Sequence, residues 1–301
     1  MLMSVDRRPT LYNRQKVLIA LLQAFGGTLP NVDMQKYLFL FANNCELEPS
    51  YEFVPYHFGC FSFQSYADRR KLIEFGILVD SDGWVLTDDD EKLPADLVKK
   101  AGLFADKYRT LKGDELVRSV YRDYPYYAIH SGIASRLLTP TEMAAIEKAR
   151  PEEKAPAFFT IGYEGQSFEN YLNRLLRNNI QLLCDVRKNP LSRKYGFSKK
   201  TLSETLAKLG IQYLHFPELG IVSDKRRTLK TNADYQALFA EYEVTTLQSE
   251  QKALDRLAGL AQQHQRVAIT CFEAEHCMCH RSKIACHLEA RPDWHYPILH
   301  I

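Results

Sequence analysis

From residue 158 onward the chain alternates strand patterns with helical patterns, and this alternation constrains the fold more than any other feature. Apolar runs typical of strands are FFTIGY, IQLLCDVR, IQYLHFPEL, RVAITCFE and YPILHI, at residues 158–163, 180–187, 211–219, 266–273 and 296–301. Between the runs, apolar residues recur at helical spacing, as in Leu202, Leu206 and Leu209. The pattern predicts an α/β domain in which helices cover both faces of a mostly parallel sheet.

The first half of the chain has a different pattern. Helical spacing predicts helices at residues 14–25, 34–45 and 63–75, and Asp82-Gly83 is a hairpin-turn signal within residues 77–87. Three helices followed by a hairpin is the order of a winged helix. The charged, proline-containing stretch EKARPEEKAPAFF then separates the two patterns. We expect a winged-helix-like α+β domain at residues 1–146, a linker at 147–157 and the α/β domain at 158–301.

Three blocks of the first half carry a resemblance that covers most of residues 12–135. KYLFLFANN, YEFVPYHFGCFSFQSYADRRKLIEFGIL and LVRSVYRDYPYYAIHS resemble a bacterial and archaeal family of winged-helix proteins, although Cys60 stands where proline is expected. Related modules occur beside toxins and phage-defence genes, so the resemblance implies regulation or nucleic-acid recognition. Gln64, Arg69 and Arg70 on the third helix are then candidates for contacts to phosphates or base edges. A winged helix serves equally well as a protein–protein module. We expect Tyr56 and His57 to be buried structural residues, because both neighbours of this pair are apolar.

Polar residues of the second half follow the predicted strands. Asp185 and Arg187 end one strand, and Glu273 follows another, close to His280 and Arg281. Ligands of open α/β sheets bind outside the carboxyl ends of the strands, where loops and helix N-termini converge. We therefore expect these five residues to form one pocket, although almost a hundred positions separate the two groups.

The same residues carry a second resemblance, which spans about residues 157–301. TIGYEGQSFENYLNRLL, LLCDVRKNPLSRKYGFSK, LGIQYLHFPELG and ITCFEAEHCMCHRSKIACHL are similar to the four blocks of the uncharacterised-domain family 488 (DUF488). The resemblance implies an α/β fold but names no reaction. Tyr163-Glu164 departs from the histidine and serine that many members have there. The family's motif positions correspond to Gly162, Asp185, Arg187, Pro190, Arg193, Glu218, Leu219, Gly220, Glu273, Cys279, His280 and Arg281.

The densest chemistry lies in CFEAEHCMCHR, residues 271–281. Structural zinc usually draws ligands from paired CxxC-type motifs, whereas Cys277-Met-Cys279 is a CxC without a second pair, so zinc is possible but not favoured. A nucleophilic cysteine of the phosphatase type needs an arginine six positions later, and Cys277 has Lys283 there. The seven cysteines do not form a disulfide framework and are expected to be reduced thiols.

An anion pocket explains more of these residues at once. Arg187, Arg193 and Arg281, with the backbone donors of a helix start, are suited to a phosphodiester. Asp185 and Glu273 then supply a general base or a cation site, with His280 or His215 as proton donor. The alternative is that both carboxylates pair with the arginines and only hold the loops. The net charge is +2, but the segments VRKNPLSRKYGFSKK and DKRRTLK are strongly basic and predict a polyanion surface. Its candidate contacts are Arg193, Lys194, Arg226 and Arg227.

Together these features predict a protein that acts on nucleic acid, with DNA favoured over RNA, or on a nucleotide. The leading hypothesis is a hydrolase that attacks a phosphodiester or a nucleobase in DNA repair or phage defence, aided by the winged helix. The alternative is a regulator that binds nucleic acid or senses a nucleotide without chemistry. The N-terminus lacks the apolar region of a signal peptide, and no apolar run approaches the ~20 residues that a bilayer requires, so we expect a cytoplasmic protein without membrane contact. The sequence does not predict the oligomeric state.

Overall fold

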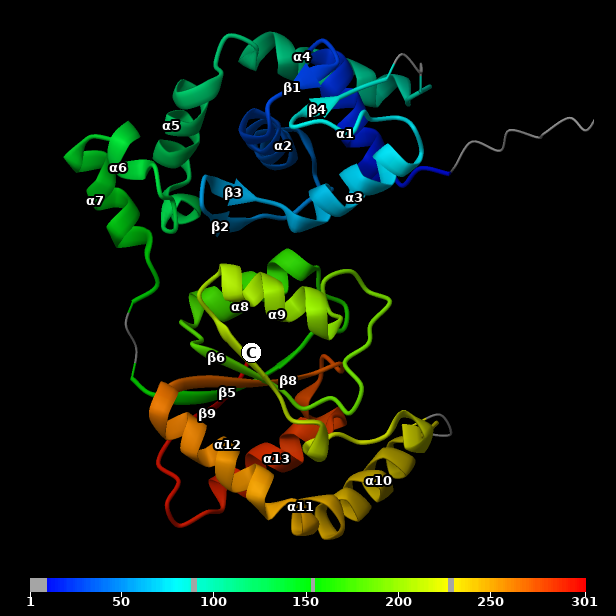
Figure 1. Ribbon diagram of the computed structural model, residues 1–301, viewed down its shortest axis with the longest axis vertical. Helices are drawn as coiled ribbons and strands as arrows, with labels where there is room; N and C mark the ends of the chain where they lie inside the picture. The colour runs from blue at the N-terminus through cyan, green and yellow to red at the C-terminus, as the bar shows by residue number, and fades with distance from the viewer. Residues whose placement is uncertain (1–9, 88–90, 153–154, 227–229) are drawn as a thin grey trace, which may run out of the picture. The chain divides into compact units, whose positions relative to one another are not determined.

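A computed structural model describes residues 10–87, 91–152, 155–226 and 230–301. The chain divides into two compact units, Met1–Arg150 and Pro151–Ile301 (Figure 1). None of the helices in the described parts has the length and apolar character needed to cross a membrane.

Unit 1 is mainly helical and holds two short antiparallel sheets. Its elements are α1 (Asn13–Ala24), β1 (Thr28–Leu29), α2 (Asn31–Cys45), β2 (Val54–Tyr56), β3 (Gly59–Phe61), α3 (Phe63–Glu74), β4 (Trp84–Val85), α4 (Ala95–Tyr108), α5 (Gly113–Asp123), η1 (Pro125–Ala128), α6 (Ala134–Leu137) and α7 (Pro140–Ala149). Strand β1 pairs with β4, and β2 pairs with β3. The predicted helices are confirmed as α1, α2 and α3. The hairpin around Asp82-Gly83 is confirmed by an antiparallel bridge from Leu78 to Leu86.

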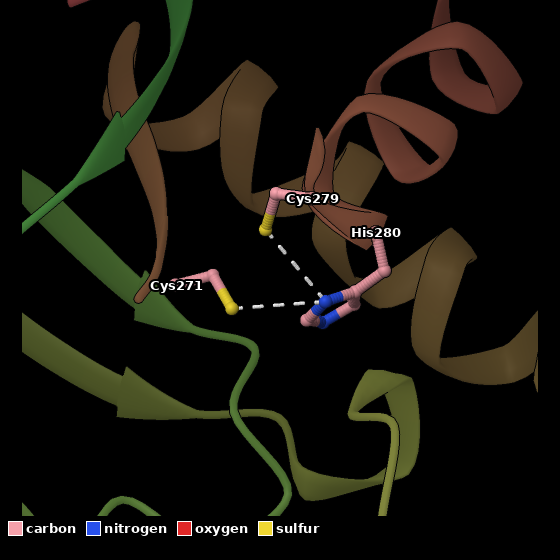
Figure 2. Close-up of side chains that lie close together, drawn as sticks. All are labelled: Cys271, Cys279 and His280. Carbon is pink, nitrogen blue, oxygen red and sulfur yellow. Dashed lines mark hydrogen bonds between the residues drawn. The ribbon is translucent and has the colours of Figure 1, made fainter. Parts of the chain in front are cut away.

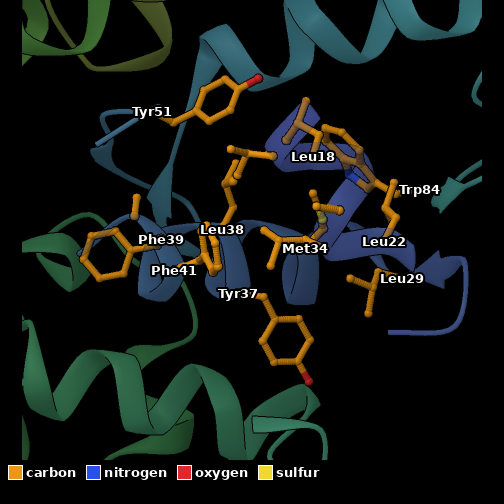
Figure 3. Close-up of a cluster of buried hydrophobic side chains, with 14 of the residues drawn as sticks. Leu18, Leu22, Leu29, Met34, Tyr37, Leu38, Phe39, Phe41, Tyr51 and Trp84 are labelled. Carbon is orange, nitrogen blue, oxygen red and sulfur yellow. The ribbon is translucent and has the colours of Figure 1, made fainter. Parts of the chain in front are cut away.

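Helix α2 is the centre of the unit 1 core. Leu38, Phe39 and Phe41 are completely buried (Figure 3). Tyr37 stacks on Phe25 with ring centroids 4.1 Å apart. Burying one such side chain contributes about 1.5–3 kcal/mol, so this helix supplies much of the stability of the unit. Because α2 is buried on nearly all sides, it also carries the polar residues Gln35 and Lys36 into the interior.

Unit 2 contains a five-stranded parallel sheet. Its elements are β5 (Ala157–Gly162), α8 (Phe168–Arg177), β6 (Leu182–Asp185), α9 (Lys199–Lys208), β7 (Gln212–His215), η2 (Pro217–Leu219), η3 (Ser223–Arg226), α10 (Asn232–Val244), α11 (Thr246–Ser249), α12 (Gln251–His264), β8 (Arg266–Cys271), η4 (His276–Met278), α13 (His280–Glu289) and β9 (Ile298–His300). The strand order is β7-β6-β8-β5-β9, and every neighbouring pair is parallel. The predicted α/β architecture is therefore confirmed for this unit.

The order of the strands locates a binding crevice. Helices α8 and α9 cover one face of the sheet, and α12 and α13 cover the other (Figure 1). The chain leaves β8 toward α13, whereas it leaves the neighbours β5 and β6 toward α8 and α9. Connections that depart to opposite faces open a crevice at the carboxyl ends of the strands, which is where open α/β sheets bind ligands.

Candidate functional site

The crevice beside the end of β8 contains a pocket of about 220 Å³. Each of the three central strands contributes to its wall, because their carboxyl ends lie side by side in the register of the sheet. Helix α13 adds its first residue. The lining residues are Tyr163, Arg187, Lys188, Asn189, Leu191, Ile221, Cys271, Phe272 and His280.

Arg187 is held rigidly in the pocket wall. Its Nε donates to Oδ1 of Asp185 at 2.8 Å, and its Nη2 donates to Oδ2 at 2.5 Å. Its Nη1 donates to the hydroxyl of Tyr163 and to the carbonyl of Phe197, both at 2.8 Å. Burial alone lowers the pKa of Arg187, but the hydrogen bonds and charge of Asp185 raise this pKa overall. The guanidinium is therefore a fixed, permanent cation.

The carboxylate of Asp185 is saturated with donors. Besides the Arg187 side chain, Oδ1 accepts from the Arg187 backbone N–H at 3.1 Å, and Oδ2 accepts from the Tyr213 hydroxyl at 2.7 Å. Burial and the negative charge of Asp185 raise the pKa of Tyr213, so this hydroxyl stays a donor. Asp185 is completely buried. The pairing alternative considered from the sequence fits this geometry: Asp185 orients Arg187 and has no lone pair directed at a substrate.

Cys271, Cys279 and His280 form a compact group of possible metal ligands (Figure 2). The two Sγ atoms lie 3.7 and 3.8 Å from Nδ1 of His280, and the three possible ligand atoms are all within 4.8 Å of one another. The Nε2 of His280 lies 3.1 Å from the carbonyl oxygen of Val186. A carbonyl can only accept, so Nε2 carries the proton and Nδ1 directs its lone pair at the two sulfurs.

The spacing of this group fits a tetrahedral metal ion. Zinc binds sulfur at about 2.3 Å and nitrogen at about 2.1 Å, so tetrahedral angles place S and N about 3.6 Å apart. The distances of 3.7 and 3.8 Å are close to this separation. The bond from His280 to the Val186 carbonyl is the outer-shell contact that usually orients a metal-binding histidine. Thiolate and imidazole ligands select zinc over magnesium or calcium.

Glu273 and Arg281 shape the loop between the ligands. The carboxylate of Glu273 accepts from the Cys271 thiol at 3.3 Å. The buried guanidinium of Arg281 donates to the backbone carbonyls of Glu273 and Ala274, and its Nε has no hydrogen-bond partner among the described residues. Arg281 therefore holds the backbone of residues 273–274 in place. The sequence did not predict that it would do so through backbone carbonyls. Gly162, the register partner of Cys271, allows the loop to pass, since a Cβ there would lie 1.8 Å from the Glu273 carbonyl oxygen.

The five residues expected to share one pocket do lie at one edge of the sheet, but in distinct roles. Arg187 and His280 line the pocket, Asp185 lies behind Arg187, and Arg281 lies behind Glu273. Sequence reasoning missed Cys271 and Tyr213 as contributors. Cys271 was concealed because its partners lie eight and nine residues later rather than in a CxxC pair. A Cys-x7-Cys-His spacing from a strand end to a helix start is the signal that identifies it.

The basic residues predicted to bind nucleic acid occupy varied positions. Arg193 is exposed, and Lys194 donates to the carbonyl of Tyr163 at 3.1 Å. Arg227 and the side chain of Arg226 lie outside the described residues.

In unit 1, Arg70 is exposed, whereas the other two candidates on α3 have internal partners. Gln64 donates to Asp68 at 3.3 Å. Arg69 donates to the carbonyls of Ser81 and Gly83 at 2.6 and 2.7 Å, so it fastens the hairpin turn.

Comparison with known proteins gives one family. Residues 167–288, most of unit 2, match the model of the family described as Domain of unknown function DUF488. The match includes β6, β8 and the start of α13, so it contains every candidate metal ligand. Neither the curated proteins nor the solved structures include a significant match to this chain.

Proposed function

We propose that unit 2 is a zinc-dependent hydrolase that acts on a nucleotide or on nucleic acid. The observation that carries the proposal is the group formed by Cys271, Cys279 and His280. This group lies in the crevice at the carboxyl ends of the strands, next to the fixed cation of Arg187. Sequence reasoning did not favour zinc, because it considered the CxC pair. In the structure, the cysteine that lies close to Cys279 and His280 is Cys271 rather than Cys277, and we therefore favour a zinc site.

Cys271, Cys279 and His280 would hold the zinc ion, which would supply a water molecule acidic enough to react near neutral pH. Glu273 would be the general base for this chemistry, since its carboxylate lies 3.3 Å from the sulfur of Cys271. A Cys-Cys-His ligand set beside a glutamate that is not a ligand is also the arrangement that zinc-dependent nucleobase deaminases use. Attack on a nucleobase is therefore favoured over cleavage of a phosphodiester.

The pocket suits such a substrate. Its volume of about 220 Å³ accommodates one base, and the rings of Tyr163 and Phe272 offer surfaces for stacking. Lys188 and Asn189 are exposed at the pocket and, with Arg187, supply cationic and polar contacts for a phosphate. In this proposal Asp185 positions Arg187 and does not react.

Unit 1 has the role of nucleic-acid recognition in this proposal. Its order of helices followed by a hairpin supports a winged-helix-like domain, in which exposed Arg70 on α3 contacts the phosphate backbone. In this proposal the target is DNA rather than RNA. All seven cysteines are free thiols, which fits the cytoplasmic location that we propose.

Metal analysis of the purified chain tests the proposal directly. We expect about one zinc per chain. Cys271→Ser, Cys279→Ser and His280→Ala should each lose the metal, while Cys277→Ser should keep it, because Cys277 is exposed and outside the group. Cobalt substitution should give a thiolate charge-transfer band that disappears in the same three variants. A metal-free protein whose Cys271 reacts rapidly with iodoacetamide would refute the zinc centre and favour a Cys–His nucleophile.

Product analysis tests the reaction. Nucleoside monophosphates and single-stranded DNA, incubated with the zinc-loaded chain, should yield ammonia and the deaminated base. Glu273→Gln should retain zinc but lose this activity, because the amide cannot accept the proton. Strand scission without ammonia would refute nucleobase attack. Tight nucleotide binding without any product would instead support a regulator.

A further inference from the structure

Unit 1 contains a pocket of about 300 Å³ that the proposed function does not use. It lies between α2 and the β2–β3 hairpin, and its walls are largely aromatic. Phe61 stacks on Tyr66 with ring centroids 5.0 Å apart, and Tyr56 lies 5.0 Å from Phe61. His57 and Phe58, at the turn of the hairpin, are exposed, so His57 is not the buried residue expected from the sequence. The lining residues are Asn31, Val32, Gln35, Lys36, Tyr56, His57, Phe58, Gly59, Cys60, Phe61 and Tyr66.

Lys36 is the unusual residue of this wall. Its exposed fraction is 1%, and its Nζ donates to the carbonyl oxygen of Cys60 at 3.2 Å. Among the described residues no carboxylate forms an ion pair with it. An ammonium group offers three donors, and a buried charge without a counter-ion is costly. The buried amine therefore lowers the stability of the fold. A leucine or methionine at this position would not have this effect.

Burial lowers the pKa of Lys36, while interactions with Cys60, including a hydrogen bond, and the charge of Asp33 act in the opposite direction. The net direction is downward, so a larger share of Lys36 is neutral at a given pH than of an exposed lysine. A neutral amine has a free lone pair and is a nucleophile. The titratable and charged groups that surround it are Asp33 on the same helix, Cys60 on β3, and Tyr56, His57 and Tyr66 in the pocket wall.

We propose that Lys36 is a reactive amine that forms an imine with a planar, aldehyde-bearing ligand in the aromatic pocket. The Nζ lone pair attacks the carbonyl carbon, the C=O π pair moves to oxygen, and the resulting carbinolamine loses water to give C=N. No oxidant or reductant is needed. The flat ring of the ligand packs on Tyr56 and Phe61, which belong to the same pocket wall as Lys36. This site is independent of the zinc centre of unit 2.

Reductive trapping tests this proposal. The full chain is treated with salicylaldehyde and sodium cyanoborohydride at pH 7, and the modified lysines are mapped by peptide mass spectrometry. Lys36 should be labelled faster than exposed Lys99, because each unit of pKa depression raises the neutral fraction about tenfold. Propanal, which lacks a ring, should show a much smaller preference for Lys36.

Two controls make the result decisive. Urea should abolish the preference, since unfolding removes the pocket and restores the ordinary amine. Lys36→Arg keeps a positive charge but forms no imine. This variant should therefore lose the fast labelling at position 36, while the labelling of Lys99 stays unchanged. Labelling confined to exposed lysines in the folded chain would overturn the proposal. The same conclusion would follow if Lys36 reacted no faster in the folded chain than in urea.

Discussion

Replacing Gly162 with alanine should separate the end of β5 from the loop that joins the candidate metal ligands Cys271 and Cys279. The new Cβ would lie 1.8 Å from the carbonyl oxygen of Glu273 and 3.0 Å from Nη1 of Arg281. The loop has to move outward at Glu273, which breaks the hydrogen bond from Arg281 to the Glu273 carbonyl. Overpacking costs about 1–3 kcal/mol and a hydrogen bond to a charged group about 1.5–3 kcal/mol, so we expect a loss of about 4 kcal/mol. For a unit of about 150 residues this lowers the Tm by roughly 10 °C.

The two tryptophans make the measurement specific, because Trp84 is in unit 1 and Trp294 is in unit 2. Trp294 packs on Phe158 of β5 with ring centroids 5.2 Å apart. In a Trp84→Phe background, its fluorescence reports the thermal unfolding of unit 2. Gly259→Ala is the matched control: this glycine lies within α12 with open space around it, so alanine should stabilise by about 0.5–1 kcal/mol. The reasoning fails if the Gly162 variant unfolds within about 1 kcal/mol of the parent.

Other substitutions separate structural from chemical roles. Asp185→Asn should destabilise unit 2 by about 3–5 kcal/mol, measured by urea unfolding, because it leaves the buried Arg187 charge unpaired; normal stability with lost activity would contradict the positioning role. Tyr213→Phe should cost about 1.5–3 kcal/mol in the same assay, since one hydrogen bond to a charged carboxylate is lost. Lys36→Met should raise the Tm of unit 1 at pH 7. Because the folded pKa of Lys36 lies below its usual 10.5, the unfolded chain binds more protons and the stability of the parent rises with pH, so the difference should shrink toward pH 10.5. Arg193→Ala should reduce the slope of log affinity for duplex DNA against log salt by about 0.9; an unchanged slope would exclude a phosphate contact.

The periodicity of the sequence was sufficient to predict the parallel sheet and the edge at which its polar residues gather. Asp185 and Glu273 were placed at strand ends because apolar runs stop there, and β6 and β8 end at or near those positions. Periodicity says nothing about which way a side chain turns. Asp185 turns inward to Arg187 and Tyr213, and this choice depends on the register that places Tyr213 beside Leu183, on a neighbouring strand.

The candidate metal ligands could be identified only from the three-dimensional structure. Cys271 and Cys279 lie on opposite sides of a loop, and their separation depends on how η4 turns back before α13 begins. The antiparallel β2–β3 hairpin was also missed, because its strands have three residues each and show no alternation. Gly59, at φ +91° in that hairpin, is the local signal, since only glycine adopts this conformation without strain.

The bond from His280 to the Val186 carbonyl would couple two binding events, that of a metal ion at His280 and that of an anion at Arg187. Val186 lies between Asp185 and Arg187, so the peptide that orients the imidazole also belongs to the backbone that carries the guanidinium. If an ion at His280 raises the affinity of Arg187 for an anion by some factor, the anion raises the affinity for the ion by the same factor. Loss of the anion would then lower the affinity of the site for the metal ion. Loss of the metal ion would lower the affinity of the pocket for the anion. The occupancy of each site would therefore depend on the concentration of the other ligand.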